Sequence, residues 1–407
     1  MEKVIIERMD HQGRGIGKIN NLVIFIPNTL IGEEVKIKIE KERKHYLEGE
    51  ALEFIKTSDK RINPKCPYFE KCGGCNLMHM NLEDQLEYKN EMIKDIFKRY
   101  LNEKIKIEPI INLNEYNYRN KITFQVNKKI GFYQNKTNSL IEIDECLIAN
   151  KKINNILKII KDNLKLDTVS KIIIRASENT DDIMVIIETS KDLNTSFLEK
   201  QVSSIVIKNK NYKTVYGKNK IIENLGPYSF WISPNAFFQT NTLVATKLYD
   251  SIIELADFNQ NDNALDLFCG TGTISIYISP YVKKVIGIEI NEDAVNDANE
   301  NKKLNKVENV LFKCGDVGTI LNKETYHPDV VIVDPPRSGL DKKAINELLK
   351  INAKKIIYVS CNPITLARDL NLLNSSYEVK VVRPFDMFPN TYHVECVSLL
   401  YRKTLEK

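Results

Sequence analysis

Residues 263–276 read NALDLFCGTGTISI, a short apolar run followed by two glycines around a threonine and then by apolar residues at helical spacing. A strand, a glycine turn and a helix in this order are typical of the first unit of a doubly wound parallel sheet, where glycine lets a ligand approach the helix N-terminus. From about residue 240 onward, strand and helix patterns alternate, as such a sheet requires. The C-terminal part of the chain is therefore predicted to be an α/β domain.

Three acidic residues stand at the ends of the strands predicted around this turn. Glu289 closes the strand VIGIEI about 20 residues after Gly270, a spacing at which an acid usually binds ribose hydroxyls. Asp316 follows VLFKC, and Asp334 follows VVIV. Parallel strands end at one edge of a sheet, so these positions should converge there, although each acid could instead cap a helix. The loop lacks the third glycine of a pyrophosphate cradle, which favours a nucleoside cofactor without phosphates, namely S-adenosylmethionine.

The next predicted strand, KKIIYVS, brings Cys361 to the same edge. Methylation of an exocyclic amine needs no thiol, and Arg337 in VDPPR replaces the aromatic residue of amine methyltransferases. C5 of a pyrimidine, in contrast, becomes nucleophilic only after a thiolate has added at C6, and a base must later remove the C5 proton. Glu395 in the last predicted strand is a candidate for that base, with His393 on the same side. A structural thiol is the alternative for Cys361, and Cys314 is expected to be a small buried side chain.

The eight cysteines are unevenly distributed, because three of them crowd into CPYFEKCGGC at residues 66–75. In a cytosolic chain, such a cluster favours metal binding over disulfides. The spacing suits either zinc, with His79 as a further possible ligand, or a cubane iron–sulfur cluster. Sequence spacing alone leaves both open.

The remaining patterns predict two domains before the catalytic one. Residues 1–57 contain several short strands, such as EEVKIKIE, typical of a small OB-like barrel that either binds RNA or only packs against its neighbours. Residues 58–235 are predicted to form a central α+β domain, with a helix at 81–101 that could pack on the catalytic domain. The catalytic domain itself is predicted at 236–407.

Composition sets broad limits on the function. The 407 residues include 28% charged residues and carry a net charge of +5, which suits a globular protein and permits, without requiring, a nucleic-acid partner. No apolar stretch approaches the roughly 18 residues of a membrane helix, and the first residues lack the apolar core of a secretory signal. A cytoplasmic protein without membrane contact is therefore expected.

Taken together, these motifs resemble those of the RNA uracil-C5-methyltransferases, which make 5-methyluridine from S-adenosylmethionine. The resemblance covers nearly the whole chain and rests on a TRAM domain at the start and on CPYFEKCGGC, YRNKITF, SPNAFFQTN, LDLFCGTGT, VDPPRSG, SCNPITLARDL and HVE. It implies a Rossmann-like class I methyltransferase domain, with Cys361 as nucleophile and Glu395 as base. It also implies a set of cofactor contacts, namely Gln239, Phe268, Thr273, Glu289, Asp316 and Asp334, which join Gly270 of the glycine turn.

The resemblance extends to the cysteines and to the substrate. Members that act on ribosomal RNA carry a [4Fe–4S] cluster on cysteines that match Cys66, Cys72, Cys75 and Cys146, whereas the transfer-RNA member lacks both the TRAM domain and these cysteines. A uridine of 23S ribosomal RNA, methylated before full subunit assembly by a monomeric enzyme, is therefore the expected target. Arg119 and Lys121 resemble the RNA-facing strand of the family, although a solvated strand face explains them equally well. Alternatives are an RNA cytosine-C5-methyltransferase, a transfer-RNA uridine methyltransferase and a non-catalytic RNA-binding protein.

Overall fold

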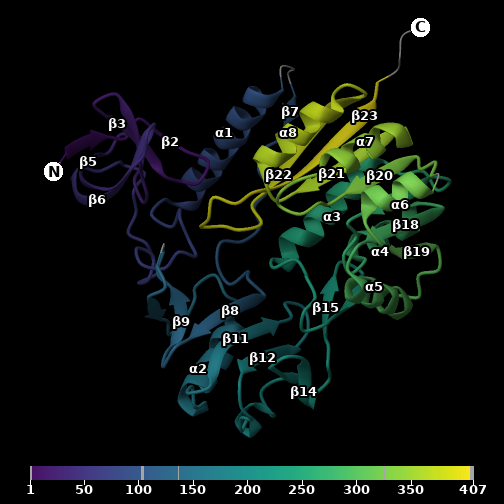
Figure 1. Ribbon diagram of the computed structural model, residues 1–407, viewed down its shortest axis with the longest axis horizontal. Helices are drawn as coiled ribbons and strands as arrows, with labels where there is room; N and C mark the ends of the chain where they lie inside the picture. The colour runs from purple at the N-terminus through teal and green to yellow at the C-terminus, as the bar shows by residue number, and fades with distance from the viewer. Residues whose placement is uncertain (1, 102–104, 136, 325, 404–407) are drawn as a thin grey trace.

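A computed structural model of the chain describes residues 2–101, 105–135, 137–324 and 326–403. The C-terminal part is built on an eight-stranded sheet with the order β19-β18-β17-β20-β21-β23-β22-β7 (Figure 1). Its strands are β17 (Asn263–Leu267), β18 (Lys284–Glu289), β19 (Val310–Cys314), β20 (Val330–Val333), β21 (Lys355–Ser360), β22 (Tyr377–Phe385), β23 (Glu395–Arg402) and β7 (Lys106–Ile107). The strands from β19 to β21 run parallel, and β23 pairs antiparallel with both β21 and β22. The predicted α/β class is confirmed.

Helices cover both faces of this sheet because its central strands are apolar on both sides. In β20, Val330 and Ile332 join the core on one face, and Val331 and Val333 join the core on the other. The first core contains residues of α3 (Thr242–Ala256), α4 (Thr273–Ile278) and α5 (Glu292–Leu304). The second core contains residues of α6 (Val317–Lys323), α7 (Lys342–Ile351) and α8 (Pro363–Leu373).

A segment that precedes the catalytic domain in sequence completes this second core. Helix α1 (Leu82–Tyr100) begins at Asn81, whose side chain accepts a hydrogen bond from the Asp84 N–H, and buries Ile93 and Phe97 in the same cluster as α8. Just after α1, β7 adds to the edge of the catalytic sheet by pairing parallel with β22. The helix and the edge strand therefore belong structurally to the C-terminal sheet, although they lie far from it in sequence.

A second sheet of seven strands, in the order β10-β9-β8-β11-β12-β13-β14, forms the lower part of the molecule in Figure 1. Its strands are β8 (Lys121–Val126), β9 (Ile130–Tyr133), β10 (Leu140–Glu142), β11 (Val169–Ala176), β12 (Ile183–Thr189), β13 (Ser204–Lys208) and β14 (Tyr212–Gly217). Helix α2 (Lys151–Asn163) packs on it through isoleucines and a leucine at helical spacing. The hairpin of β15 (Ile221–Leu225) and β16 (Tyr228–Ile232) connects this sheet to α3.

The N-terminal strands form a separate six-stranded sheet with the order β1-β5-β6-β4-β3-β2. They are β1 (Glu2–Ile5), β2 (Arg8–Met9), β3 (Gly15–Ile19), β4 (Leu22–Ile26), β5 (Glu34–Glu42) and β6 (Tyr46–Lys56), and β1 also lies against β3. Alternate residues of these strands, such as Val35 and Ile37, fill a small core of their own. Across the described parts of the chain, no helix is both long and apolar enough to span a bilayer.

Candidate active site

The predicted site residues meet at the carboxyl edge of the parallel strands. Phe268 and Gly270 follow β17, Glu289 ends β18, Asp334 follows β20 and Cys361 follows β21. Because these strands are parallel neighbours, the loops after them open on the same side of the sheet. The sheet therefore brings together positions that span almost a hundred residues of sequence.

The glycine loop leaves room for a ligand and is held by Glu289. The N–H of Gly270 donates to Glu289 Oε2 at 3.1 Å. Gly270 has a φ of +53°, and a Cβ added there would meet no atom within 4 Å, so open space lies in front of it. Gly272, with a φ of +79°, is instead packed against Phe312 at 2.5 Å from such a Cβ. The first glycine thus faces a ligand space, and the second permits close helix packing.

Asp316 lies near this edge and also caps the N-terminus of α6. It is the N-cap of α6, with Oδ1 accepting the Thr319 N–H at 2.8 Å and lying 3.3 Å from Lys343 Nζ. The Thr319 hydrogen bonds and the nearby ammonium group hold the pKa of this exposed carboxyl below its usual range. Helix capping, the alternative considered for the acids, therefore applies to Asp316. Cys314, two residues earlier, is exposed rather than buried as expected, because it is the last residue of the edge strand β19.

Tyr249 of α3 is a member of the site that sequence reasoning missed. Its hydroxyl lies 2.9 Å from Thr273 Oγ1, and the Gln239 side chain lies close to it. Tyr249 is buried and close to the carboxylates of Asp266 and Asp334. The phenol thus joins two of the predicted cofactor contacts, although nothing in the local pattern of α3 distinguishes it from a core tyrosine.

Three enclosed carboxyl groups give this edge an affinity for positive charge. Burial raises the pKa of Asp266 to about 7, and burial together with Asp266 raises that of Asp334 to about 7. Burial and then Asp334 raise the pKa of Glu395 to about 8. Asp266 Oδ2 accepts from Ser275 Oγ at 2.5 Å, while its buried Oδ1 has no partner among the described residues. A cationic ligand would relieve the repulsion among these groups, which fits the sulfonium and ammonium charges of S-adenosylmethionine.

Cys361 and its surroundings form a small cavity of about 150 Å³ beside this edge. Burial, and then the charges of Glu395 and Asp334, raise the pKa of the Cys361 thiol to about 11, while Arg337 opposes the shift. Arg337 Nη2 lies 3.3 Å from His393 Nδ1, and both residues line the cavity. Burial and the Arg337 charge lower the pKa of His393 to about 4, so its imidazole is neutral near pH 7.

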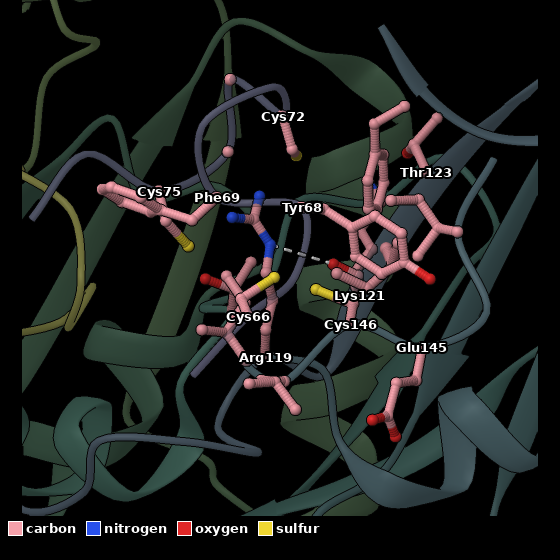
Figure 2. Close-up of a pocket in the computed structure, with 18 of the residues that line it drawn as sticks. Cys66, Tyr68, Phe69, Cys72, Cys75, Arg119, Lys121, Thr123, Glu145 and Cys146 are labelled. Atoms are coloured by element: carbon pink, nitrogen blue, oxygen red, sulfur yellow. Dashed lines mark hydrogen bonds between the residues drawn. The ribbon is translucent and has the colours of Figure 1, made fainter. Parts of the chain in front are cut away.

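The four cysteines predicted to bind metal line one cavity of about 560 Å³ (Figure 2). Cys66, Cys72 and Cys75 come from the segment before α1, and Cys146 from the segment before α2; all four are free thiols. Burial, and then repulsion by Cys146, raise the pKa of Cys75, so the sequence-distant thiol lies close to the others. In the described residues, however, no three His, Cys, Asp or Glu side chains form a group compact enough for a single metal ion.

His79, the further ligand considered for zinc, lies outside this cavity. It is fully buried and packs against Phe69 with ring centroids 5.5 Å apart, and neither ring nitrogen has a hydrogen-bond partner among the described residues. Burial lowers the pKa of His79 to about 3. His79 is therefore a side chain of the hydrophobic core and is not placed to bind zinc together with the cysteines.

Arg119 and Lys121 lie in the wall of the cysteine cavity rather than on a solvated strand face (Figure 2). Arg119 Nε donates to the Lys121 carbonyl at 3.2 Å. Burial, and then the charge of Arg175 on the neighbouring strand, lower the pKa of Lys121 to about 8. This cationic group would balance the negative charge of a thiolate-bound cluster.

One loop connects the cysteine cavity to the cofactor side of the site. In SPNAFFQTN, Phe238 and Thr240 line the cysteine cavity, whereas the Gln239 side chain lies close to Tyr249. Asn120 of YRNKITF fixes this loop, because its Nδ2 donates to the Gln239 carbonyl at 2.9 Å and to Thr242 Oγ1 at 3.0 Å. The side-chain amide of Asn120 therefore holds the loop in place, a role that the sequence did not reveal.

Comparison with known proteins agrees with this geometry. The family model described as tRNA (Uracil-5-)-methyltransferase matches residues 81–314 and 318–403, and that of the TRAM domain matches residues 2–52. A Staphylococcus epidermidis protein named "Uncharacterized RNA methyltransferase" is 35% identical over 98% of this chain and 96% of its own length. A Clostridium tetani protein of the same name is 36% identical over 97% of this chain and 95% of its own.

A solved structure matches over the whole chain as well. It is the Pyrococcus abyssi tRNA (uracil-54, C5)-methyltransferase in complex with S-adenosyl-L-homocysteine, with a TM-score of 0.82 and 28% sequence identity. The match covers 98% of this chain and 99% of that chain. It therefore includes the TRAM region, so the presence of a TRAM domain does not by itself separate ribosomal from transfer RNA as the substrate.

Proposed function

Because the chain belongs to the family of S-adenosylmethionine-dependent RNA (uracil-5-)-methyltransferases, we propose that it methylates C5 of a uridine through a covalent adduct between Cys361 and C6. The cofactor supplies the electrophilic methyl group. The chain's own groups do the rest: the Cys361 thiolate adds to C6, which raises the electron density at C5, and Glu395 later takes the C5 proton so that the thiolate can leave.

The observation that carries this proposal is the position of Cys361 and Glu395 at one end of the sheet. The ladder of β21 and β23 pairs Ser360 with Cys396, which places Cys361 and Glu395 across from each other at the next step. Glu395 is buried, and its charge raises the pKa of Cys361, so the carboxyl group lies close to the thiol, although Cys361 lines the small cavity and Glu395 does not. One pyrimidine ring is the size of substrate that this space of about 150 Å³ suits.

We further propose that Cys66, Cys72, Cys75 and Cys146 hold a [4Fe–4S] cluster. Four thiols around a cavity of about 560 Å³ suit a cubane better than a single ion, which requires its ligands to converge on one point. The cationic side chains of Arg119 and Lys121 in the cavity wall support a group of net negative charge. These four cysteines favour 23S ribosomal RNA as the substrate, since the ribosomal-RNA members of the family carry a cluster at matching positions.

Transfer RNA is the second candidate substrate, favoured by the whole-length similarity to the Pyrococcus abyssi enzyme. We expect the chain to act as a monomer in the cytoplasm on RNA that is not yet fully assembled, since the target base must leave its stack to reach Cys361. Single-stranded loops allow this more easily than helices do.

The proposed function is tested by methylation of three purified substrates under matched salt. These are protein-free large-subunit ribosomal RNA, assembled large subunits and total transfer RNA, each treated with the enzyme and labelled S-adenosylmethionine. We expect 5-methyluridine in the free ribosomal RNA and little in assembled subunits. Preferred labelling of transfer RNA would show that transfer RNA, the second candidate, is the substrate. Label on cytidine would contradict the proposed methylation of uridine.

A further inference from the structure

The turn between β2 and β3 of the TRAM domain reaches the cavity of Cys361. His11 and Gln12, at the tip of this turn, line the cavity of about 150 Å³ together with Cys361, Arg337 and His393. The turn belongs to the six-stranded N-terminal sheet, whereas the other three residues belong to the catalytic domain. Two domains therefore contribute side chains to one small space around the nucleophile.

The backbone of this turn is fixed by a dense set of hydrogen bonds. Asp10 Oδ1 accepts the N–H groups of Gln12 at 2.9 Å and of Arg14 at 2.8 Å, and Asp10 Oδ2 accepts from the Arg14 guanidinium at 2.6 and 2.8 Å. Tyr88 of α1 donates to the Asp10 carbonyl at 2.5 Å and accepts the Gly13 N–H at 3.0 Å. The turn is thus rigid and anchored to the helix that packs on the catalytic domain.

Close packing keeps the turn against the catalytic loop. Gly13 has a φ of +74°, and a Cβ added there would lie 2.8 Å from Leu77 and 3.9 Å from Tyr392, next to His393. In contrast, the side chains of His11 and Gln12 are exposed and form no hydrogen bond with any described residue. The molecule therefore holds the backbone of the turn firmly while leaving two polar side chains free to bind a ligand.

A larger groove leads away from the cavity at this point. The groove, about 960 Å³, runs between the TRAM domain and α1 and shares His11, Met92, Ile96 and Ile364 with the cavity of Cys361. An RNA strand whose target base occupies the cavity must leave along a path of this kind. His11 lines both spaces and Gln12 lines the cavity beside it, so the two side chains lie where the neighbouring nucleotide would enter.

The charges along the groove indicate which part of that nucleotide enters it. The side formed by α1 is lined by four acids, namely Asp84, Glu87, Glu91 and Asp95, and by the cations Arg99 and Lys60; Lys60 pairs with Asp84 and Glu87. Glu91 and Asp95, which Lys60 does not contact, would repel phosphate, whereas Met92 and Ile96 next to them offer apolar contact to a neutral base. On the TRAM side, Arg8 is exposed and placed to meet the phosphate backbone, whereas the Arg14 guanidinium is held by Asp10.

We propose that His11 and Gln12 recognise the base of the nucleotide adjacent to the target uridine, which makes the TRAM turn a specificity-determining part of the active site. Gln12 can both donate to and accept from a base edge, and the His11 ring can stack or hydrogen-bond. This inference rests on the proposed function, since it presupposes a uridine in the cavity of Cys361.

The test is a double-mutant cycle between protein and RNA. The substrate is a synthetic stem–loop with one loop uridine that the wild-type enzyme methylates, together with two versions that carry an abasic nucleotide immediately 5′ or 3′ of that uridine. Initial rates of methyl transfer give kcat/KM for the wild-type enzyme and for His11→Ala/Gln12→Ala. The control is His45→Ala, an exposed histidine between β5 and β6 of the same domain that lines neither the cavity nor the groove.

We expect the wild-type enzyme to lose about tenfold in kcat/KM on one of the two abasic RNAs, which corresponds to about 1.4 kcal/mol. On the intact RNA, kcat/KM of the double variant should be lower than that of the wild-type enzyme by a similar factor. On that abasic RNA, the two enzymes should have equal kcat/KM. His45→Ala should show the wild-type ratio of kcat/KM between intact and abasic RNA. If the double variant retains the full abasic penalty, or the wild-type enzyme shows none, the inference is wrong while the proposed function stands. A wild-type enzyme that methylates no uridine RNA would contradict the proposed function itself.

Discussion

Cys361 and Glu395 lie opposite each other at the end of the antiparallel ladder of β21 and β23, one step beyond the pair Ser360–Cys396. Side chains at such opposed positions lie on the same face with Cβ atoms about 5 Å apart. Cys396 points to the other face and is buried in the second core. A strand register, rather than proximity in sequence, therefore places a carboxyl group beside the thiol.

The opposed pair predicts different failures for two substitutions. Cys361→Ala should abolish both methyl transfer and any covalent RNA–protein species. Glu395→Gln should still form the adduct but release it about 10²–10⁴-fold more slowly, because the proton acceptor is missing. Denaturing electrophoresis with labelled cofactor detects the trapped methylated adduct. Cys396→Ala serves as the matched control and should turn over, and an adduct that persists in Cys361→Ala/Glu395→Gln would refute the assigned roles.

The raised pKa of Glu395 predicts a pH dependence for the breakdown of the adduct. The carboxyl group is active as a base only when deprotonated, and its pKa is about 8. As the pH rises towards 8, the rate of adduct breakdown should increase about tenfold per pH unit, and above pH 8 the rate should become constant. Formation of the adduct should instead keep rising beyond pH 8, because the pKa of Cys361 is about 11. Rapid-quench single turnovers between pH 6 and 9 separate the two steps, and a breakdown rate that is flat below pH 8 would count against Glu395.

A buried ion pair predicts a large effect on stability. Lys89 Nζ of α1 lies 2.6 Å from Asp386 Oδ1, and both side chains are 0% exposed. The bond ties α1 to the loop that leads to Glu395. Lys89→Met leaves a buried, uncompensated carboxylate and should lower the free energy of unfolding by about 3–5 kcal/mol.

The control for this change is on the same helix. Lys94 pairs with Glu91 at 2.8 Å, but the two side chains are 55% and 64% exposed. Lys94→Met should therefore lower the free energy of unfolding by less than about 1 kcal/mol. Lys89→Met/Asp386→Leu should recover most of the loss, since it removes both charges. Equal urea midpoints for Lys89→Met and Lys94→Met would show that the buried pair contributes nothing.

The cysteine cavity predicts the metal content. Protein purified without air should be brown and contain about four iron and four sulfide ions per chain. Cys146→Ser should lose most of this iron and lower the yield of folded protein, because a site that binds metal in the folded state stabilises that state. Cys314→Ser, an exposed thiol outside the cavity, should retain the full iron content. A colourless wild-type protein with one zinc ion would exclude the cluster.

The order of amino acids is enough to predict the C-terminal parallel sheet and several residues at its carboxyl edge. Short apolar runs that alternate with helical spacing specify a parallel sheet, and such a sheet sends the ends of its strands to one edge. Gly270, Glu289, Asp334 and Cys361 can therefore be grouped from the amino-acid order alone. The rule is local, because it depends only on which residue follows each strand. It is less decisive for Asp316, whose position suits a helix cap equally well.

The surroundings of that edge, in contrast, depend on contacts between distant parts of the chain. The pair of Lys89 with Asp386, the bond of Tyr249 with Thr273 and the approach of His11 to Cys361 each join segments that share no pattern in sequence. Secondary-structure periodicity fixes which face of an element is apolar, but not which distant element covers that face. Those pairings depend on the simultaneous packing of several domains, and through that packing the TRAM turn comes to lie beside the Cys361 thiol.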